Sequence, residues 1–371
     1  MTTIVVGAGI FGASVAYSLA LSGEDVCVVD QQHEGQATAA GAGIVCPWFT
    51  ERGESWYTLA SAGAKYYQDL LEQLRQDGEE ETGYKIVGAM AISEDPEKLD
   101  RIEQMARLRQ EEAPEAGDIT RLTQKQANML YPPLDSRYEA VHISGAARLD
   151  GRLLRNSLQK AAEKHGVQFL NARAELVVEQ EVVKGVLVDN QLLPADHVVL
   201  TSGAWINEIL ETIGVRIPVE PQKGQIAHLE LPGVDTSKWP VILPKTGHYQ
   251  LSFDDSRVVV GATRETGSGF DYRVTAEGLK EVLDEALYVA PGLANSTLKE
   301  TRIGFRPAGP DVTPLFGRIP TVKGLVVATG LGASGLTMGP YVGKLTADIV
   351  LKKDMDVDVE AYSPLRYQKD E

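Results

Sequence analysis

Short hydrophobic runs and a longer apolar stretch succeed one another in the first thirty residues. Residues 3–6 and 25–30 are short runs rich in valine, and the stretch between them, residues 10–21, is rich in alanine and leucine. Short runs of this kind predict buried strands, whereas the longer stretch predicts a helix. The order strand, turn, helix, strand is typical of a βαβ unit with a parallel sheet.

Helices and strands alternate through the next part of the chain. Helical periodicity predicts helices at about residues 59–75, 95–112 and 150–165. Short apolar runs predict strands at residues 88–93, 167–170, 176–180, 182–188 and 195–201.

The pattern changes in the third quarter of the chain. Between residues 217 and 263, apolar and polar positions alternate in several short runs, as in antiparallel strands with one solvated face. A helix is then predicted at 276–288. After it come a buried strand at 325–328, a glycine loop and a last helix that ends near Leu351.

These patterns predict an α/β protein with two interleaved domains. A Rossmann-type, dinucleotide-binding domain is expected to comprise about residues 1–80, 140–215 and 305–371. An α+β substrate domain with a mainly antiparallel sheet is expected to comprise about residues 81–139 and 216–304. A chain of 371 residues is long enough for two such cores.

Charge and hydropathy narrow the classes of function. The formal net charge of −16 repels phosphate backbones and anionic lipid surfaces, and the lysines and arginines are scattered, so we expect no nucleic-acid partner. Residues 2–23 and 324–343 carry no charge, but glycines interrupt both stretches. We interpret them as backbone packed against a ligand and expect no transmembrane segment.

The cysteines and histidines narrow the possible classes of function further. Two cysteines, Cys27 and Cys46, make no disulfide framework and fit a cytoplasmic protein. The six histidines have no metal-ligand spacing, so no metal site is expected. No Gly-x-Ser-x-Gly or Walker sequence occurs. The sequence leaves open whether the chain forms a homo-oligomer.

The sequence Gly7-Ala8-Gly9-Ile10-Phe11-Gly12 lies between the first predicted strand and helix. In a dinucleotide-binding fingerprint the first glycine allows a tight turn, the second lets a pyrophosphate approach, and the third lets helix and strand pack closely. The helix N-terminus offers N–H groups to the phosphates. Asp30, at the end of the second strand, can accept hydrogen bonds from ribose hydroxyls and disfavours the 2′-phosphate of NADP. The motif alone does not choose between FAD and NAD.

Several later segments, taken in order, favour FAD over NAD as the cofactor. They are Ala37-Thr38-Ala39-Ala40-Gly41-Ala42-Gly43, Ser202-Gly203-Ala204-Trp205, Lys223-Gly224-Gln225, Gly261-Ala262-Thr263, Gly304-Phe305-Arg306-Pro307, Pro314-Leu315-Phe316-Gly317 and residues 330–337. Their order and spacing resemble the D-amino-acid oxidase superfamily, in particular its glycine oxidase, sarcosine oxidase and D-amino-acid dehydrogenase branch. The resemblance covers essentially the whole chain and implies non-covalent FAD.

The resemblance also implies where FAD lies. The small, flexible segment from Thr38 to Ile44 would lie against a phosphate or the flavin ring, and Leu176 would lie beside the adenine. The loop before the last helix, with Pro340 in the first helical turn, would direct N–H groups at the flavin's pyrimidine edge. The residues expected to bind FAD are Gly7, Gly9, Ile10, Phe11, Gly12, Asp30, Gln31, Thr38, Ala39, Ala42, Gly43, Ile44, Leu176, Ser202, Gly203, Trp205, Arg306, Gly332, Ala333, Ser334, Gly335, Leu336 and Thr337.

Two residues are expected at the substrate. Arg306 corresponds to the arginine that pairs with the substrate carboxylate in glycine and D-amino-acid oxidases, and a guanidinium matches a carboxylate bidentately. A structural salt-bridge arginine is the alternative. Tyr249 corresponds to a tyrosine that shapes the same site, although a strand tyrosine can simply belong to the core.

Two departures from the family leave the substrate open. Glycine oxidases carry a basic residue in the last glycine loop, where this chain has Ala333-Ser334. Sarcosine oxidases attach flavin through a late cysteine, which this chain lacks. Cys46 lies just beyond the flavin-facing segment, and packing is the role expected for it.

The expected function is FAD-dependent oxidation of a small amine or amino acid, such as glycine, sarcosine, a D-amino acid or an N-substituted amino acid. Hydride transfer from the α-carbon to flavin N5 would give an imine that water hydrolyses. Molecular oxygen, or else a quinone or carrier, would take the electrons. The alternative from another class is an FAD-containing structural or sensing protein that turns over no substrate.

Overall fold

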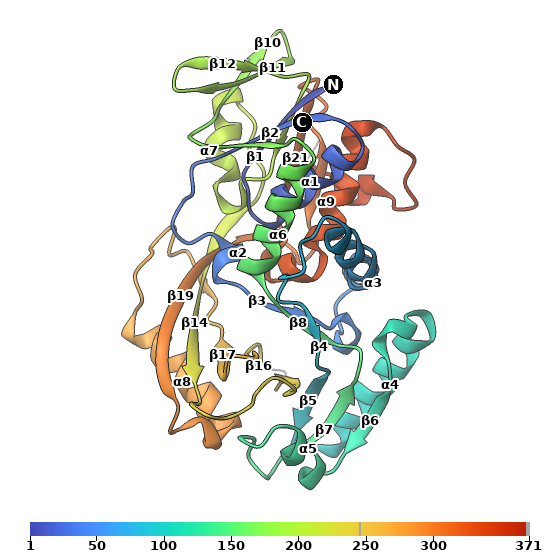
Figure 1. Ribbon diagram of the computed structural model, residues 1–371, viewed down its shortest axis with the longest axis vertical. Coiled ribbons are helices and arrows are strands. Elements are labelled where there is room, and N and C mark those ends of the chain that lie inside the picture. The colour runs from blue at the N-terminus through green and yellow to red at the C-terminus, as the bar shows by residue number, and fades with distance from the viewer. Residues whose placement is uncertain (245, 369–371) are drawn as a thin grey trace.

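The computed structural model of the chain describes residues 1–244 and 246–368. Within these residues the strands form two large sheets and two small ones. The large sheets lie one above the other in Figure 1, and segments from the whole length of the chain contribute to both halves of the molecule.

The first large sheet is mainly parallel. Its strands are β1 (Thr2–Val6), β2 (Asp25–Asp30), β9 (Gln168–Asn171), β13 (His197–Leu200), β20 (Leu315–Arg318) and β21 (Leu325–Thr329). Their order is β20-β21-β13-β1-β2-β9, and the edge strand β20 runs antiparallel to β21. The central strands are buried on both faces, which explains their continuous valine-rich sequences. The longer helices of this half are α1 (Ile10–Leu21), α3 (Glu54–Gln76), α6 (Gly151–Lys164) and α9 (Gly335–Leu351).

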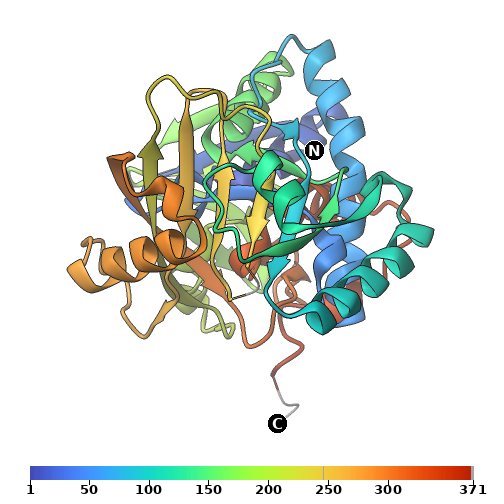
Figure 2. The same cartoon turned by 90° about the horizontal axis from the view of Figure 1, so that it is seen from below.

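The second large sheet is mainly antiparallel. Its strands are β5 (Ala89–Ser93), β6 (Ile119–Leu122), β7 (Glu139–Ile143), β14 (Glu220–Glu230), β15 (Val241–Leu243), β16 (Tyr249–Ser252), β17 (Arg257–Gly261), β18 (Glu265–Thr266) and β19 (Thr297–Ala308). The order is β18-β14-β17-β16-β15-β5-β7-β6, and β19 pairs with β14 along its whole length. Figure 2 shows α8 (Ala276–Val289) at one side of this half and α4 (Pro96–Glu112) at the other, with α5 (Gln124–Leu130) between them.

Two small sheets complete the fold. β10 (Glu175–Glu179), β11 (Val182–Val188) and β12 (Gln191–Pro194) form an antiparallel sheet at one end of the molecule. β3 (Ala42–Val45), β8 (Ala147–Asp150) and β4 (Lys85–Ile86) form the other, between the two halves in Figure 1. The short helices α2 (Ala37–Ala40) and α7 (Ile206–Leu210) join segments near the first sheet.

The predicted fold class is confirmed, because a parallel sheet with helices is combined with a mainly antiparallel sheet. The expected domain boundaries stay a prediction. β19 crosses the boundary expected near residue 305, since it remains paired with β14 as far as Ala308.

Two local expectations were wrong. The segment from Thr38 to Ile44, which the sequence indicates to be flexible, instead forms α2 and β3, and β3 pairs with β8 from Ala42↔Asp150 to Val45↔Ala147. The third helix begins at Glu54 rather than near residue 59, because Trp56 and Tyr57 bury their rings in the core and extend the apolar face toward the N-terminus.

Pro340 lies in the second turn of α9 and not in the first, because this helix already begins at Gly335. A proline has no N–H to donate to the carbonyl four residues earlier, which is that of Leu336. The hydroxyl of the buried Tyr67 on α3 donates to this carbonyl instead. A side chain of α3 therefore supplies the hydrogen bond that Pro340 cannot donate to the Leu336 carbonyl.

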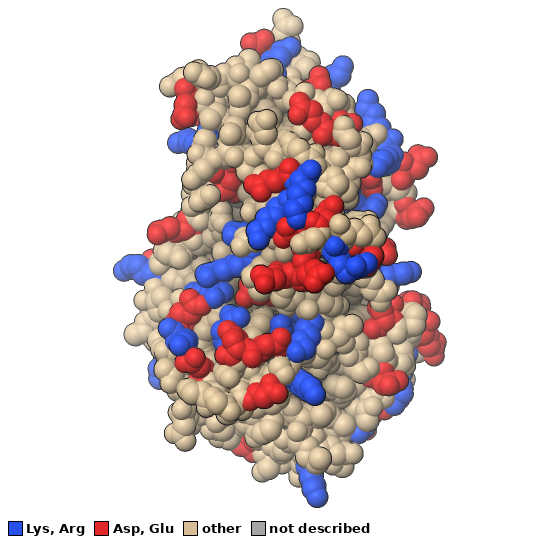
Figure 3. Space-filling view, in the orientation of Figure 1, with Lys and Arg blue, Asp and Glu red and all other residues tan. Residues whose placement is uncertain are grey.

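No helix among residues 1–244 and 246–368 is both long and apolar enough to cross a membrane. On the face shown in Figure 3, acidic and basic side chains are interspersed rather than gathered into a patch of one sign.

Substitution Tyr67→Phe should lower the free energy of unfolding by about 1–3 kcal/mol, the cost of leaving a buried carbonyl without a donor. Urea unfolding of the cofactor-loaded protein, followed by circular dichroism, measures this change. Tyr84→Phe is the matched control, because the Tyr84 ring stacks on Tyr67 but its hydroxyl has no hydrogen-bond partner among the described residues. Equal losses for the two variants would contradict the role given to the Tyr67 hydroxyl.

Candidate active site

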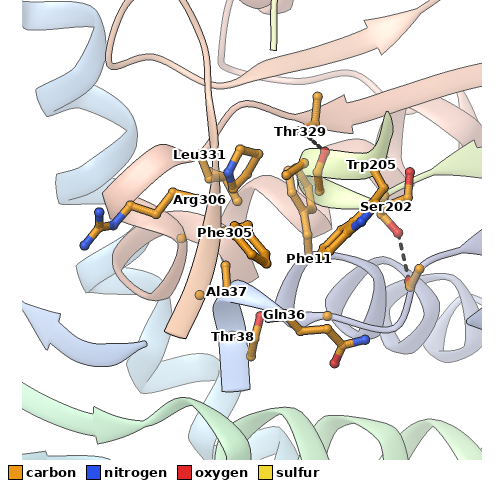
Figure 4. A pocket seen from close by; sticks show the side chains of 18 of the residues that line it. Phe11, Gln36, Ala37, Thr38, Ser202, Trp205, Phe305, Arg306, Thr329 and Leu331 are labelled. Atoms are coloured by element: carbon orange, nitrogen blue, oxygen red, sulfur yellow. Dashed lines mark hydrogen bonds between the residues drawn. The ribbon is translucent and has the colours of Figure 1, made fainter. Parts of the chain in front are cut away.

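A cleft of about 460 Å³ runs between the two large sheets. The carboxyl ends of β1, β2 and β13 open into it, as expected for ligand binding in a parallel α/β sheet. Its other walls come from α2, β3, β10, β16, β19 and the loop before α9. Figure 4 shows some of the side chains that line it, including Thr38, Trp205 and Arg306. Both halves of the molecule therefore contribute to one site.

The glycine motif forms a tight turn at the end of β1. Gly7 has φ +107°, and a Cβ there would lie 2.7 Å from the carbonyl oxygen of Thr201. A Cβ on Gly12 would lie 1.8 Å from the carbonyl oxygen of Gly7, so α1 packs directly on the turn. Gly9 lines the cleft, where a Cβ would meet Thr38 Oγ1 at 3.4 Å. These three positions match the three roles of the fingerprint.

The N-terminus of α1 faces the cleft with N–H groups to offer. Gly9, the N-cap residue, has no side chain to cap this helix, and within the described residues only the Ile10 N–H is taken by a side chain, Thr38 Oγ1 at 3.0 Å. Ser202 also lines the cleft, and its buried hydroxyl has no hydrogen-bond partner within the described residues. A bound diphosphate would satisfy such donors, so these residues fit a dinucleotide.

Asp30 lies beside this turn. Its carboxylate accepts hydrogen bonds from the Ala8 N–H at 2.5 Å and from Gln36 Nε2 at 3.2 Å. A carboxylate can accept further hydrogen bonds, so Asp30 can still take a ribose hydroxyl. Arg155 Nη1 donates to Gln36 Oε1 at 3.2 Å and fixes the glutamine from behind.

A stack of aromatic side chains lies at the end of the cleft that contains Asp30. The His33 ring stacks on Trp205 with centroids 4.5 Å apart, and Trp205 stacks on Phe270 at 4.8 Å. Burial lowers the pKa of His33 below its usual value, while Glu208 and Asp30 oppose this shift. Residues 172–176, from the end of β9 to the start of β10, complete this end of the cleft, and their contact with the adenine stays a prediction.

The loop before α9 forms the wall nearest the second sheet. Gly332, Ala333, Gly335, Leu336 and Thr337 line the cleft. Ser334 does not line it, because its hydroxyl accepts from Trp56 Nε1 at 2.9 Å and from Arg52 Nη1 at 3.1 Å. The last glycine loop contains no basic residue of its own, but the guanidinium of Arg52 reaches it from another segment.

The strand that carries Arg306 is tied to the cofactor side of the cleft. The Phe305 N–H donates to the carbonyl oxygen of Gly35 at 2.8 Å. Gly35 has φ +78°, and a Cβ there would lie 2.3 Å from the Phe305 ring. A glycine is required at this close approach. The bridge sets Arg306, the next residue, at a fixed position relative to α2.

Arg306 lies in the cleft wall without an acidic partner among the described residues. Its Nη1 donates to the Thr263 carbonyl oxygen at 3.0 Å and faces Gln222 Oε1 at 3.5 Å. Burial lowers the pKa of Arg306 from its usual value, but an arginine remains charged at any physiological pH. The alternative role as a salt-bridge arginine is not supported, because Arg306 makes no ion pair with any residue in 1–244 or 246–368.

Tyr249 faces the same space from β16 and also lines the cleft. Burial raises the pKa of the Tyr249 hydroxyl, and the nearby positive charges of Arg306 and Arg264 only partly oppose this shift. The phenol is therefore neutral near pH 7 and can donate a hydrogen bond. Arg306 and Tyr249 together offer a carboxylate one charged and one neutral hydrogen-bond donor.

Most residues predicted from the sequence line this cleft, but four do not. Gly12 packs against Gly7, Gly43 packs against Leu149, and the Ala39 carbonyl accepts from Arg152. Ser334, the fourth, holds Arg52 and Trp56. Their contacts with FAD stay a prediction.

Sequence reasoning also missed several residues of the cleft wall. Those with polar or aromatic side chains include His33, Gln36, Arg173, Glu175, Glu208, Arg264, Phe305 and Thr329. Phe305 lies within a segment that the resemblance had already indicated and Gln36 adjoins another, which was the available signal. Arg264 follows Gly261-Ala262-Thr263 directly, so it too had a signal.

The fold and this cleft define a dinucleotide-dependent oxidoreductase. The family model of the FAD dependent oxidoreductases (DAO) matches residues 2–349. The chain belongs to this family, and FAD is its cofactor, which confirms the prediction made from the sequence.

Similar proteins extend over the whole chain. The uncharacterized oxidoreductase YurR of Bacillus subtilis strain 168 is 52% identical over 97% of this chain and 98% of the relative. The glycine oxidase of Pseudomonas aeruginosa PAO1 is 29% identical over 97% of this chain and 98% of that protein. The crystal structure of iminodiacetate oxidase from Chelativorans sp. BNC1 has a TM-score of 0.95 and 51% identity, covering 98% of each chain.

Substitution Gly9→Ala should weaken FAD binding at least about tenfold while the fold is kept, because the new methyl group would crowd a phosphate. Gly9 has φ −67°, which alanine adopts freely. Fluorescence titration of the apoprotein with FAD measures the affinity.

Gly12→Ala is the contrasting variant, because its methyl group would clash with the Gly7 carbonyl and disturb the fold itself. Circular dichroism separates the two effects. If Gly9→Ala binds FAD as tightly as the wild type, this turn does not hold the diphosphate.

Proposed function

We propose that the protein oxidises a small amine that carries a carboxymethyl group, using FAD, and that Arg306 binds the carboxylate. The observation that carries this proposal is the guanidinium of Arg306, which lies in the cleft wall without an acidic partner among the described residues. Iminodiacetate, named as the substrate of the 51% identical relative, is a secondary amine of this class. Glycine, named for the 29% identical relative, is the simplest primary amine of the class.

The residues of this site would bind and orient the substrate rather than react with it. Arg306 would hold the carboxylate through its planar guanidinium, and the Tyr249 hydroxyl would donate a further hydrogen bond. With the carboxylate fixed at two points, the neighbouring Cα–H bond has a restricted direction, which lowers the entropic barrier to transfer. FAD supplies the acceptor for the two electrons and the proton that leave together as hydride.

The amine must be neutral when the hydride leaves, because its lone pair forms the new C=N bond. No side-chain base is needed if the amine binds in its neutral form. Repulsion by the nearby guanidiniums disfavours an ammonium ion in the site, which supports that form. Water then hydrolyses the imine to an amine and a carbonyl compound.

We infer that oxygen accepts the electrons, as the term oxidase in the names of both relatives suggests. A dehydrogenase that passes electrons to a quinone or carrier is the alternative. The rate at which the reduced protein recovers its yellow colour on admission of air separates the two.

Anaerobic addition of a carboxymethyl amine should bleach the flavin absorbance of the wild type, and Arg306→Lys should lower kcat/KM by about 10- to 100-fold with FAD still bound. Lysine keeps the charge but loses the bidentate geometry. Arg302→Lys is the matched control, because Arg302 lies on the same strand and pairs with Glu300. Release of FAD by Arg306→Lys, or failure of every such amine to bleach the wild type, would overturn the proposal.

Tyr249→Phe should raise KM about tenfold and leave kcat nearly unchanged, because the lost hydrogen bond is made equally to bound substrate and transition state. Steady-state kinetics at pH 7 and pH 9 measure this effect. Tyr272→Phe, on an exposed part of the neighbouring loop, should change neither parameter. A fall in kcat with constant KM would assign Tyr249 a different role.

A further inference from the structure

Arg264 is a second arginine in the cleft wall that lacks a partner. It follows β17, its side chain is exposed, and it makes no hydrogen bond or ion pair with any residue in 1–244 or 246–368. The chain has 52 acidic and 36 basic residues, so acidic partners are abundant. An unpaired arginine in the cleft wall of such an acidic protein is available to bind an anionic ligand.

The neighbours of Arg264 hold it in place. Gln225 N–H donates to Thr263 Oγ1 at 2.9 Å, and Thr263 Oγ1 donates to Glu265 Oε1 at 2.7 Å. The fully buried Lys223 lies 3.5 Å from Glu265 Oε2. The residues on both sides of Arg264 are thus anchored to β14, and the one nearby carboxylate is already engaged by other groups.

Arg264 and Arg306 are positioned by the same segment. Arg306 donates to the carbonyl oxygen of Thr263, the residue that precedes Arg264. On the other side, Gly247 has φ +98°, and a Cβ there would be 3.7 Å from Arg264 Cζ. The guanidinium therefore lies against bare backbone, beside the space between Arg306 and Tyr249.

A third guanidinium, that of Arg52, lies close enough to Arg264 to repel it. Arg52 lies over the Trp56 ring at 4.7 Å and donates to Ser334 in the loop before α9. Burial lowers the pKa of Arg52, and repulsion from Arg264 lowers it further. Two positive groups, Arg306 and Arg52, therefore lie near Arg264.

The acidic residues of the cleft wall lie at the opposite end. Among the described residues that line it, these are Asp30, Glu175 and Glu208. Glu208 and Asp30 both act on His33, which places them at the aromatic stack with Trp205. The end at Arg306 and Arg264 therefore attracts a ligand with more than one negative charge.

We propose that Arg264 binds a second carboxylate of the substrate, assisted by the charge of Arg52, so that the site selects amines bearing a carboxylate at each end. This inference rests on the proposed function and names its substrate class. The smallest such secondary amine is N-(carboxymethyl)glycine, which is iminodiacetate, the compound named for the 51% identical relative, and its two carboxylates flank one nitrogen. Oxidation of either arm and hydrolysis of the imine give one glycine and one glyoxylate, with two electrons passed to FAD.

The test uses N-(carboxymethyl)glycine and N-methylglycine, which differ only by the second carboxylate. For the wild type we expect kcat/KM to be about 10- to 100-fold higher for the dicarboxylate, as for one hydrogen bond between charged groups. Arg264→Gln should abolish this preference, because it should raise KM for the dicarboxylate about 10- to 100-fold more than KM for N-methylglycine. Arg264→Lys should restore part of the preference.

Arg101→Gln controls for the loss of one positive charge, because Arg101 is exposed on α4, away from the cleft wall. It should keep the wild-type preference. Arg52→Gln should reduce the preference less than Arg264→Gln, since Arg52 does not line the cleft.

Binding without turnover gives an independent readout. Oxydiacetate and methoxyacetate have an ether oxygen in place of the amine, and they too differ by one carboxylate. Perturbation of the flavin spectrum should give a Kd about 10- to 100-fold lower for oxydiacetate in the wild type and equal values in Arg264→Gln.

Failure of the second carboxylate site and failure of the proposed function would give different results. Equal use of the two amines by the wild type, or a preference that survives in Arg264→Gln, would overturn the second carboxylate site while the oxidation of carboxymethyl amines stands. Failure of both amines to bleach the flavin would instead overturn the proposed function.

Discussion

The backbone hydrogen bond between Phe305 N–H and the Gly35 carbonyl joins the two halves of the active site. Phe305 belongs to the antiparallel sheet, and Gly35 belongs to the chain that leaves β2 on the cofactor side. The contact requires Gly35 in a left-handed conformation, with the Phe305 ring in the space of a side chain. Together with the close packing of Gly304 on Ala40, this bond sets the position of Arg306 relative to the dinucleotide cradle, so the site needs both sheets.

Each half contributes a different kind of group to the cleft. The parallel sheet supplies backbone N–H groups and the Asp30 carboxylate, which suit a diphosphate and a ribose. The antiparallel sheet supplies guanidiniums and a phenol, which suit a carboxylate. This division explains why acidic residues gather at one end of the cleft and arginines without acidic partners at the other. The same cleft can hold a nucleotide and a small anion without mixing the two.

The sequence predicted those parts of the structure that depend on local patterns. The βαβ unit with Gly7, Gly9 and Asp30 could be identified because periodicity and turn chemistry act over a few residues. Pro340 was misplaced because the donor that replaces its N–H is Tyr67, which lies far away in the chain. Arg52 was missed for the same reason, since Ser334, its partner, is distant in sequence. Contacts between distant segments leave no local pattern.

A site with cations at two points has a consequence for the chemistry as well as for affinity. A substrate held by one carboxylate can still rotate about that anchor, and only some orientations present a Cα–H bond correctly. A second anchor on Arg264 removes this freedom on binding, so part of the entropic barrier is overcome before the hydride moves. A secondary amine with two identical carboxymethyl arms gains further, because exchanging its ends gives the same complex. The unpaired guanidiniums therefore favour a symmetric substrate, for which no binding orientation is wasted.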